Sequence, residues 1–397
     1  MNQADWVESG KKYVMQTYNY FSIVIERGEG CYVWDIEGKK YLDFVSGIAV
    51  NSLGYKNQEF INNMIEQLNK INHCSNLYYN QPQIELAQTL VENSCFDKVF
   101  FCNSGAESIE SALKLSRKYG KLVHGENCFE IITMNHSFHG RTYGAITATG
   151  QTKYQKDLEP LLPGILYSPY NDFEALKEKV TDKTCAIFIE PIQGEGGIRP
   201  AQKEFLLNVR KLCTEKNIVL VFDEVQCGIG RTGKLFAYEH YDVEPDIIAL
   251  AKGLGNGFPI GAMMARDKIA EGFKPGDHAS TFGGNPLACT AAKTVLHQLL
   301  NKDLLRNTVK QGEYLKEKLI ELRTNHDLII DNRGIGLMQG IELKIPVKPI
   351  IQDCINNGLL LVGAGENVIR FVPPLIIEEN EIDEAILTLS NALRRNS

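Results

Sequence analysis

The sequence predicts an α/β fold built around a mostly parallel central sheet. From about residue 83 onward, short apolar runs alternate with stretches that have the periodicity of amphipathic helices. The runs are apolar at consecutive positions, which is typical of strands that helices cover on both faces. The five runs span residues 98–102, 130–134, 186–189, 218–222 and 247–250. Ligands of such sheets bind beyond the carboxyl ends of the strands, so we expect the functional residues there.

The remaining elements follow from the same patterns. Residues 20–50 alternate apolar and polar positions around a turn at Glu37-Gly38-Lys39, which predicts an antiparallel meander. Helical periodicity predicts helices over residues 58–70, 107–119, 172–180, 202–216 and much of 287–322. We expect residues 1–60 to pack with a small domain, 61–286 to form a large α/β domain, and 287–397 to form the small C-terminal α+β domain.

Composition limits the classes of function. The 42 basic and 49 acidic residues give a net charge of −7, which provides no electrostatic reason to bind nucleic acid or an anionic membrane. No apolar run approaches the ~18 residues of a membrane span, and the N-terminus does not resemble a signal peptide. The ten cysteines include no Cys-x-x-Cys pair, so neither a zinc site nor a disulfide framework is indicated. We therefore expect a cytoplasmic protein without a metal.

Two motifs at strand ends have a functional and a structural interpretation. Asn103-Ser104-Gly105-Ala106-Glu107 follows the first run and opens a helix, so its backbone amides form either a phosphate site or an ordinary capped N-terminus. His136-Ser137-Phe138-His139-Gly140-Arg141-Thr142 follows the second run. It offers an aromatic ring for stacking and an arginine for a carboxylate, or else only a core Phe and a surface Arg. We do not predict a catalytic role for His139.

Three further strand ends carry charged residues. The stretch 190–197 (Glu-Pro-Ile-Gln-Gly-Glu-Gly-Gly) follows one run, and Asp223 closes the next. A carboxylate buried there needs a partner. Three interpretations are open: it pairs with a protonated ring nitrogen, it belongs to a structural ion pair, or it caps a helix. Lys252 ends the last run before a glycine-rich loop. If it is buried there, desolvation lowers its pKa and makes it a nucleophilic amine; the alternative is an ordinary lysine exposed to solvent at a strand end.

One glycine motif is rejected as a nucleotide site. Residues 228–233 match G-x-G-x-x-G after a strand, which is the context of dinucleotide binding. However, the following helical stretch is short, and the next strand ends in Lys252 instead of the acid that would bind a ribose. The chain contains no P-loop either. We interpret these glycines as an active-site loop.

Taken together, these motifs resemble the class III pyridoxal-phosphate-dependent aminotransferases of fold type I. The resemblance runs from Gly28-Glu29-Gly30 to Arg370-Phe371-Val372-Pro373-Pro374 and is most specific over 223–261. It includes the late motif Ser280-Thr281-Phe282-Gly283-Gly284-Asn285-Pro286. Within the class, residues 44–51 and 138–142 are most similar to the acetylornithine aminotransferases.

The resemblance implies a cofactor, pyridoxal 5'-phosphate. Lys252 would attach it through a Schiff base and then move a proton between the substrate carbon and the cofactor. Asp223 would keep the pyridine nitrogen protonated, Gln226 would hydrogen-bond the ring hydroxyl, and Phe138 would stack on the ring. The other implied cofactor contacts are the phosphate-binding amides of Gly105 and Ala106, the neighbouring Glu224 and Val225, and Thr281 from the other subunit of a homodimer.

Substrate recognition is also implied by the resemblance. Arg141, with Ser280 nearby, would bind the carboxylate distal to the reacting amine. Arg370 would bind the carboxylate next to the reacting carbon of glutamate. Because an ω-amine donor has no such carboxylate, Glu195 would neutralise Arg370 and swing aside for the keto acid.

The implied reaction converts N-acetylornithine and 2-oxoglutarate to N-acetylglutamate 5-semialdehyde and glutamate, as in arginine biosynthesis. Alternative donors are ornithine, succinylornithine, succinyl-diaminopimelate and 4-aminobutyrate. A class III fold also permits an aminomutase or racemase. Outside this chemistry, the rejected glycine motif would predict a nicotinamide-dependent dehydrogenase, which the context of the motif disfavours.

Overall fold

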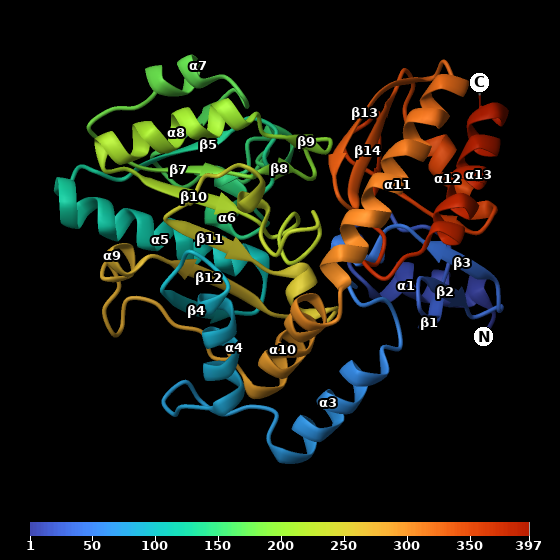
Figure 1. Ribbon diagram of the computed structural model, residues 1–397, viewed down its shortest axis with the longest axis horizontal. Coiled ribbons are helices and arrows are strands. Elements are labelled where there is room, and N and C mark those ends of the chain that lie inside the picture. The colour runs from blue at the N-terminus through green and yellow to red at the C-terminus, as the bar shows by residue number, and fades with distance from the viewer. Residues whose placement is uncertain (397) are drawn as a thin grey trace.

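A seven-stranded mixed sheet forms the centre of the larger lobe in this computed structural model, which describes residues 1–396 (Figure 1). The strand order is β4-β12-β11-β10-β7-β5-β6. All strands run in the same direction except β12, which is antiparallel to β11 and β4. The strands are β4 (Lys98–Cys102), β5 (Glu130–Met134), β6 (Ile165–Ser168), β7 (Thr184–Ile189), β10 (Val219–Asp223), β11 (Ile247–Leu250) and β12 (Gly261–Ala265). The predicted α/β class with a mostly parallel sheet is confirmed.

Helices cover both faces of this sheet, which explains why its strands are continuously apolar. Alternate residues of one strand belong to different cores: Val219 and Val221 of β10 pack with helix α5 (Gly105–His124). Leu220 and Phe222 face the opposite side, where helix α8 (Lys203–Lys216) lies. Shorter helices complete this lobe: α6 (Tyr143–Ala148), α7 (Phe173–Glu178), α9 (Asp267–Ala270) and the 3-10 turns η1 (Thr152–Tyr154), η2 (Ala237–His240) and η3 (Lys252–Gly255).

The smaller lobe combines both ends of the chain (Figure 1). The predicted meander is present as β1 (Ile25–Glu29), β2 (Tyr32–Asp35) and β3 (Lys40–Asp43), and β3 pairs in parallel with β15 (Leu359–Leu360). A second antiparallel sheet has the order β13-β14-β17-β16. Its strands and the helices around it are β13 (Ile329–Ile335), β14 (Met338–Leu343), β16 (Val362–Gly363), β17 (Val368–Phe371), α11 (Leu304–Asn325), α12 (Lys348–Asn356) and α13 (Glu379–Arg395).

Three helices lie beside the two lobes. Helix α10 (Pro286–Asn301) packs on α3 (Gln58–Lys70) and α4 (Gln81–Glu92). The remaining elements are α1 (Gln3–Tyr13), the short α2 (Ser46–Ala49) and the strand pair β8 (Ile192–Gln193) and β9 (Arg199–Pro200). The domain boundaries that we expect from the sequence stay a prediction. None of the helices within residues 1–396 has both the length and the apolar character that a membrane span requires.

Candidate active site

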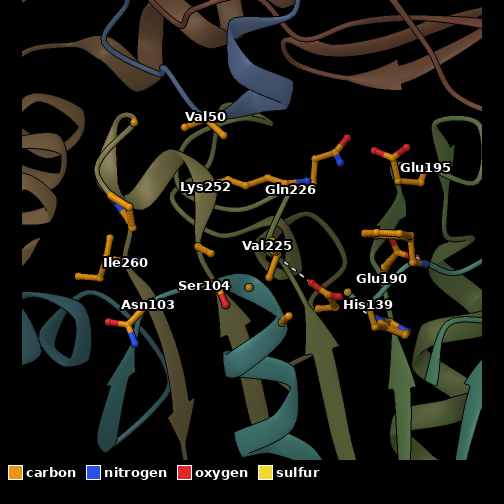
Figure 2. A pocket seen from close by; sticks show the side chains of 18 of the residues that line it. Val50, Asn103, Ser104, His139, Glu190, Glu195, Val225, Gln226, Lys252 and Ile260 are labelled. Carbon is orange, nitrogen blue, oxygen red and sulfur yellow. Dashed lines mark hydrogen bonds and ion pairs between the residues drawn. The ribbon is translucent and has the colours of Figure 1, made fainter. Parts of the chain in front are cut away.

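A cavity of about 300 Å³ lies at the carboxyl ends of the central strands, where the sequence predicts the functional residues. Six segments line it. Five belong to the large lobe, and the sixth is Val50, which directly follows α2. Its lining consists of Val50, Asn103, Ser104, Gly105, Ala106, Phe138, His139, Gly140, Glu190, Ile192, Glu195, Asp223, Val225, Gln226, Ala251, Lys252 and residues 257–260. Figure 2 shows the Lys252 side chain extending across this cavity toward Gln226.

Lys252 brings an amine into the cavity from the end of β11. Burial lowers the pKa of its ammonium group, which the positive charge of Arg370 lowers further, while the carboxylates of Glu195, Asp223 and Glu190 oppose the shift. Lys252 also has a φ of 46°, a left-handed conformation that non-glycine residues seldom adopt. A lysine with a lowered pKa in a cavity has the properties of a nucleophilic amine and of a proton carrier.

Asp223 and His139 form a buried pair at the base of the cavity. The Nδ1–H of His139 donates to Oδ2 of Asp223 over 2.7 Å, and the other carboxylate oxygen accepts the backbone N–H of Val225 at 2.9 Å. Both side chains are at most 4% exposed. Burial acts to lower the pKa of His139, but the hydrogen bond and charge of Asp223 outweigh it and raise the pKa. The motif 136–142 did not indicate that His139 is the partner of Asp223, so this pairing could not be predicted from the sequence.

Glu190 joins two parts of the cavity wall that lie far apart in sequence. Its carboxylate accepts the backbone N–H of Phe138 at 3.0 Å and that of Gly194 at 3.2 Å. Burial raises the pKa of Glu190 to about 8. Glu190 therefore fixes the Phe138 backbone relative to the loop that carries Glu195. The sequence showed an acid at a strand end but contained no signal for these two contacts.

The N-terminus of α5 forms a cradle of backbone amides at the cavity. Ser104 caps the helix by accepting the N–H of Glu107 at 3.2 Å. A Cβ at Gly105 would lie 2.7 Å from Cγ1 of Val225, so only glycine allows this close packing. The first amides of a 20-residue helix and the positive end of its dipole suit a phosphate group. Together with the ring of Phe138, the acid of Asp223 and the amine of Lys252, this cradle fits pyridoxal phosphate.

Arg370, on strand β17 of the smaller lobe, pairs with Glu195 of the cavity wall. Its Nη1 donates to Oε1 of Glu195 over 2.6 Å and to Oε1 of Gln226 over 2.9 Å. Although burial opposes ionisation, the charges of Arg370 and Lys252 and hydrogen bonds from Arg370 and Gln226 lower the pKa of Glu195. Glu195 is therefore an anionic partner of an arginine that is 1% exposed.

Five of the candidate residues are not among those that line this cavity: Arg370, which contacts it through Glu195 and Gln226, and the four that follow. Arg141 is exposed, with its guanidinium carbon 4.1 Å from the Tyr154 ring centroid. Ser280 lies beside the cavity, where its hydroxyl accepts a hydrogen bond from the Asn103 amide at 3.2 Å. Thr281 is exposed. Glu224 points away from the cavity because its carboxylate accepts the backbone N–H groups of residues 237 and 238.

The glycine-rich stretch 228–233 corrects one interpretation. We expected an active-site loop, but none of its residues lines the cavity. Its buried Arg231 instead donates to the carbonyl oxygens of Leu337 and Pro373 in the smaller lobe. The positive φ of Gly230 (82°) and Gly233 (91°) shapes a turn that connects the lobes. The glycines are explained by this packing and not by ligand contact.

Comparisons with known proteins agree with the cofactor fit. The sequence model of the family described as aminotransferase class-III matches residues 13–393. An acetylornithine aminotransferase of Caldanaerobacter subterraneus is 53% identical over 96% of this chain and 98% of its own length. Another, from Methanocaldococcus jannaschii, is 49% identical over 98% of both chains.

Solved structures show the same fold. The ornithine aminotransferase of Toxoplasma gondii ME49 superposes with a TM-score of 0.96 at 32% identity, over 100% of this chain and 96% of that one. The acetylornithine aminotransferase of Elizabethkingia anophelis has a TM-score of 0.88 at 35% identity, over 100% of both chains.

Proposed function

This chain belongs to the class-III aminotransferases, which depend on pyridoxal phosphate, and we propose that it moves the amino group of N-acetylornithine to 2-oxoglutarate. The products are N-acetylglutamate 5-semialdehyde and glutamate. The observation that supports this choice of substrates is the ion pair of the buried Arg370 with the partly exposed Glu195, whose charges both act on Lys252. It provides one site that accepts either an uncharged or a carboxylate-bearing neighbour of the reacting carbon.

We propose that the described residues hold the cofactor in the way that their positions allow. The amides of Gly105 and Ala106 would bind the phosphate, and the cofactor ring would be held between the side chains of Phe138 and Val225. Asp223 would hold a proton on the ring nitrogen. When bound, pyridoxal phosphate supplies a ring that withdraws electrons from the substrate carbon. Lys252 Nζ would be the attachment point of the cofactor and, once the substrate amine has displaced it, would be the free amine that removes and returns the proton of that carbon.

In this proposal, the charges at Arg370 decide which substrate fits. N-acetylornithine places its terminal CH₂–NH₂ at Lys252 and leaves Arg370 without a ligand, so Glu195 stays in place. 2-Oxoglutarate places a carboxylate at Arg370, and Glu195 has to move because two carboxylates there would repel each other. Arg141, at the rim near Tyr154, binds the distal carboxylate of either substrate, with Ser280 beside it.

Glu195→Gln tests this function. The neutral amide cannot compensate Arg370, so the half-reaction that removes the amine from N-acetylornithine should slow relative to the one that delivers it to 2-oxoglutarate. We expect the ratio of the two rates to change by about tenfold or more. Single-turnover absorbance of the cofactor measures both rates. The exposed Glu126→Gln is a matched control, and an unchanged ratio in Glu195→Gln would show that Glu195 is not the switch.

Donor choice has its own readout in the same assay. Wild-type enzyme should use N-acetylornithine with a higher kcat/KM than unacetylated ornithine, because the charged α-amino group of ornithine has to be desolvated. If kcat/KM for ornithine equals or exceeds that for N-acetylornithine, N-acetylornithine is not the preferred donor and another ω-amine takes its place.

We also propose that two copies of the chain form the active enzyme. The loop 76–79 lies beside the loop of Thr281, because the Asn76 amide donates to the carbonyl oxygens of Ser280 and Gly283, each at 2.9 Å. Large apolar side chains in these loops are exposed, including Leu77 (86%), Tyr79 (94%) and Phe282 (61%). A patch of this kind favours burial against a partner, which would bring Thr281 to the phosphate of the neighbouring copy.

Sedimentation equilibrium of the purified holoenzyme tests the assembly. We expect twice the chain mass of 44.5 kDa, and Leu77→Lys should shift the distribution toward the single chain. A wild-type protein that stays at the single-chain mass and is fully active would contradict the shared site.

A further inference from the structure

Two side chains of different charge hold the same nitrogen of Arg370. Nη1 donates to the carboxylate of Glu195 at 2.6 Å and to the amide oxygen of Gln226 at 2.9 Å. The other contact is weak, because Nη2 lies 3.4 Å from the carbonyl oxygen of Gly363. The buried Nε has no hydrogen-bond partner within residues 1–396. The orientation of this guanidinium therefore depends mainly on Glu195 and Gln226.

The two partners differ in their freedom to move. Glu195 is 23% exposed and stands between Gly194, Gly196 and Gly197, the last with a φ of 106°. Glycines on both sides give its backbone an unusually wide conformational range. Gln226 is 8% exposed and closely follows β10. A Cβ at Gly194 would lie 2.5 Å from Oε1 of Gln226, so the amide fills the space that this glycine leaves.

The Gln226 amide also has two chemically distinct ends. Its oxygen is occupied by Arg370, whereas its NH₂ group is a donor that serves Glu195 or another acceptor in the cavity. Release of Glu195 removes a charged partner from Arg370 but leaves the amide oxygen in place. The guanidinium then keeps one hydrogen bond to a neutral oxygen. This bond does not neutralise the positive charge that attracts an incoming carboxylate.

We propose that Gln226 is a specificity-determining residue that holds the Arg370 guanidinium in its binding orientation while Glu195 and the substrate carboxylate exchange. This inference rests on the proposed function, in which 2-oxoglutarate and glutamate use Arg370 and the ω-amine donor does not. Gln226 therefore governs the dicarboxylate half-reaction. In the donor half-reaction Glu195 stays on Arg370, so the guanidinium remains oriented without Gln226.

Two substitutions in the full-length holoenzyme test the proposal. Gln226→Met keeps the approximate side-chain volume but removes the amide oxygen. Gln226→Glu adds a fixed carboxylate that neutralises Arg370 permanently and repels the ligand. Glutarate, a dicarboxylate that carries no amino or keto group, is the binding probe for calorimetry. Single-turnover absorbance measures the two half-reactions with glutamate and with N-acetylornithine.

We expect Gln226→Met to weaken glutarate binding by about tenfold to a hundredfold, the range for a hydrogen bond to a charged group. Because Gln226 is also a candidate contact of the cofactor, both half-reactions should slow, and the glutamate half-reaction should slow by about tenfold more than the donor half-reaction. Gln226→Glu should weaken glutarate binding further. If both variants bind glutarate like the wild type, or if both half-reactions slow equally, Gln226 acts only on the cofactor and the proposal is wrong.

Controls separate this result from a general loss of packing and from failure of the proposed function. Gln339→Met removes another buried amide, one that donates to the carbonyl oxygen of Gly336 in the turn between β13 and β14, and should leave the ratio of half-reactions unchanged. Thermal melting of each variant verifies folding. The proposed function fails independently if the wild-type enzyme does not react with N-acetylornithine, whatever the variants do with glutarate.

Discussion

Replacing Lys252 by alanine is expected to reduce both half-reactions by at least about a thousandfold, because a positioned proton carrier and the covalent link to the cofactor are lost together. Lys252 is the only lysine among the cavity-lining residues of the described chain. No neighbouring amine is therefore in place to substitute for it. The amide cradle at Gly105 and the acid at Asp223 stay intact, so the cofactor should still bind, although more weakly and without a covalent bond.

Chemical trapping and rescue identify the cause of the loss. Borohydride followed by mass spectrometry should fix the cofactor to Lys252 in the wild type and to no residue in Lys252→Ala. Added methylamine should restore part of the rate, because a small primary amine can occupy the vacated space and carry the proton. Lys56→Ala, which removes an exposed ion pair with Glu29, is the control. Activity above a few per cent in Lys252→Ala would contradict the assigned role.

The central sheet was predictable because most of its strands are apolar at consecutive positions, which is typical of strands that are buried on both faces. The run 98–102 matches β4, and 247–250 matches β11. Strand β12 was missed, since Gly-Ala-Met-Met-Ala lacks the β-branched residues that favour strands and directly follows a glycine-rich loop. Its antiparallel direction is set by the space between β4 and β11, which only the assembled sheet defines.

Residues at the ends of parallel strands were predictable as a group, because the topology brings those ends to one edge. Lys252, Asp223, Phe138 and Gly105 all line the same cavity. Which atoms touch was not predictable. Gln226 and Arg370 are 144 positions apart and meet only because the smaller lobe packs β17 against the large one.

Local motifs were least reliable where packing gives a residue another partner. Glu224 sits between two cavity residues, yet its side chain faces the opposite direction and caps η2 through backbone amides. Conversely, His139 has no distinctive spacing, and its importance follows from the 2.7 Å contact with Asp223. A one-dimensional pattern does not determine the direction of a side chain in a loop.

Asp223→Asn is expected to slow both half-reactions by about a hundredfold to a thousandfold. The substitution removes the negative charge that we propose holds a proton on the ring nitrogen, and it breaks a buried pair, which typically costs about 3–5 kcal/mol. His139 would then face an amide, so the hydrogen bond and charge of Asp223 that raise its pKa would be lost and only the charge of Glu190 would still raise it. Since both substrates need the same electron-withdrawing ring, the ratio of the half-reactions should not change, in contrast to Gln226→Met.

The His139 variants show whether charge or geometry dominates at Asp223. His139→Gln retains a side-chain N–H that can donate to the carboxylate. His139→Phe leaves the Asp223 carboxylate with the backbone N–H of Val225 as its remaining hydrogen-bond donor within residues 1–396. We expect His139→Phe to lower the rates by about tenfold to a hundredfold and His139→Gln to restore most of that loss. A pH titration of the bound cofactor's absorbance reports the ring proton directly. If Asp223→Asn leaves that titration and both rates within a few-fold of the wild type, the ring nitrogen is held by another group, and the assignment of Asp223 is wrong.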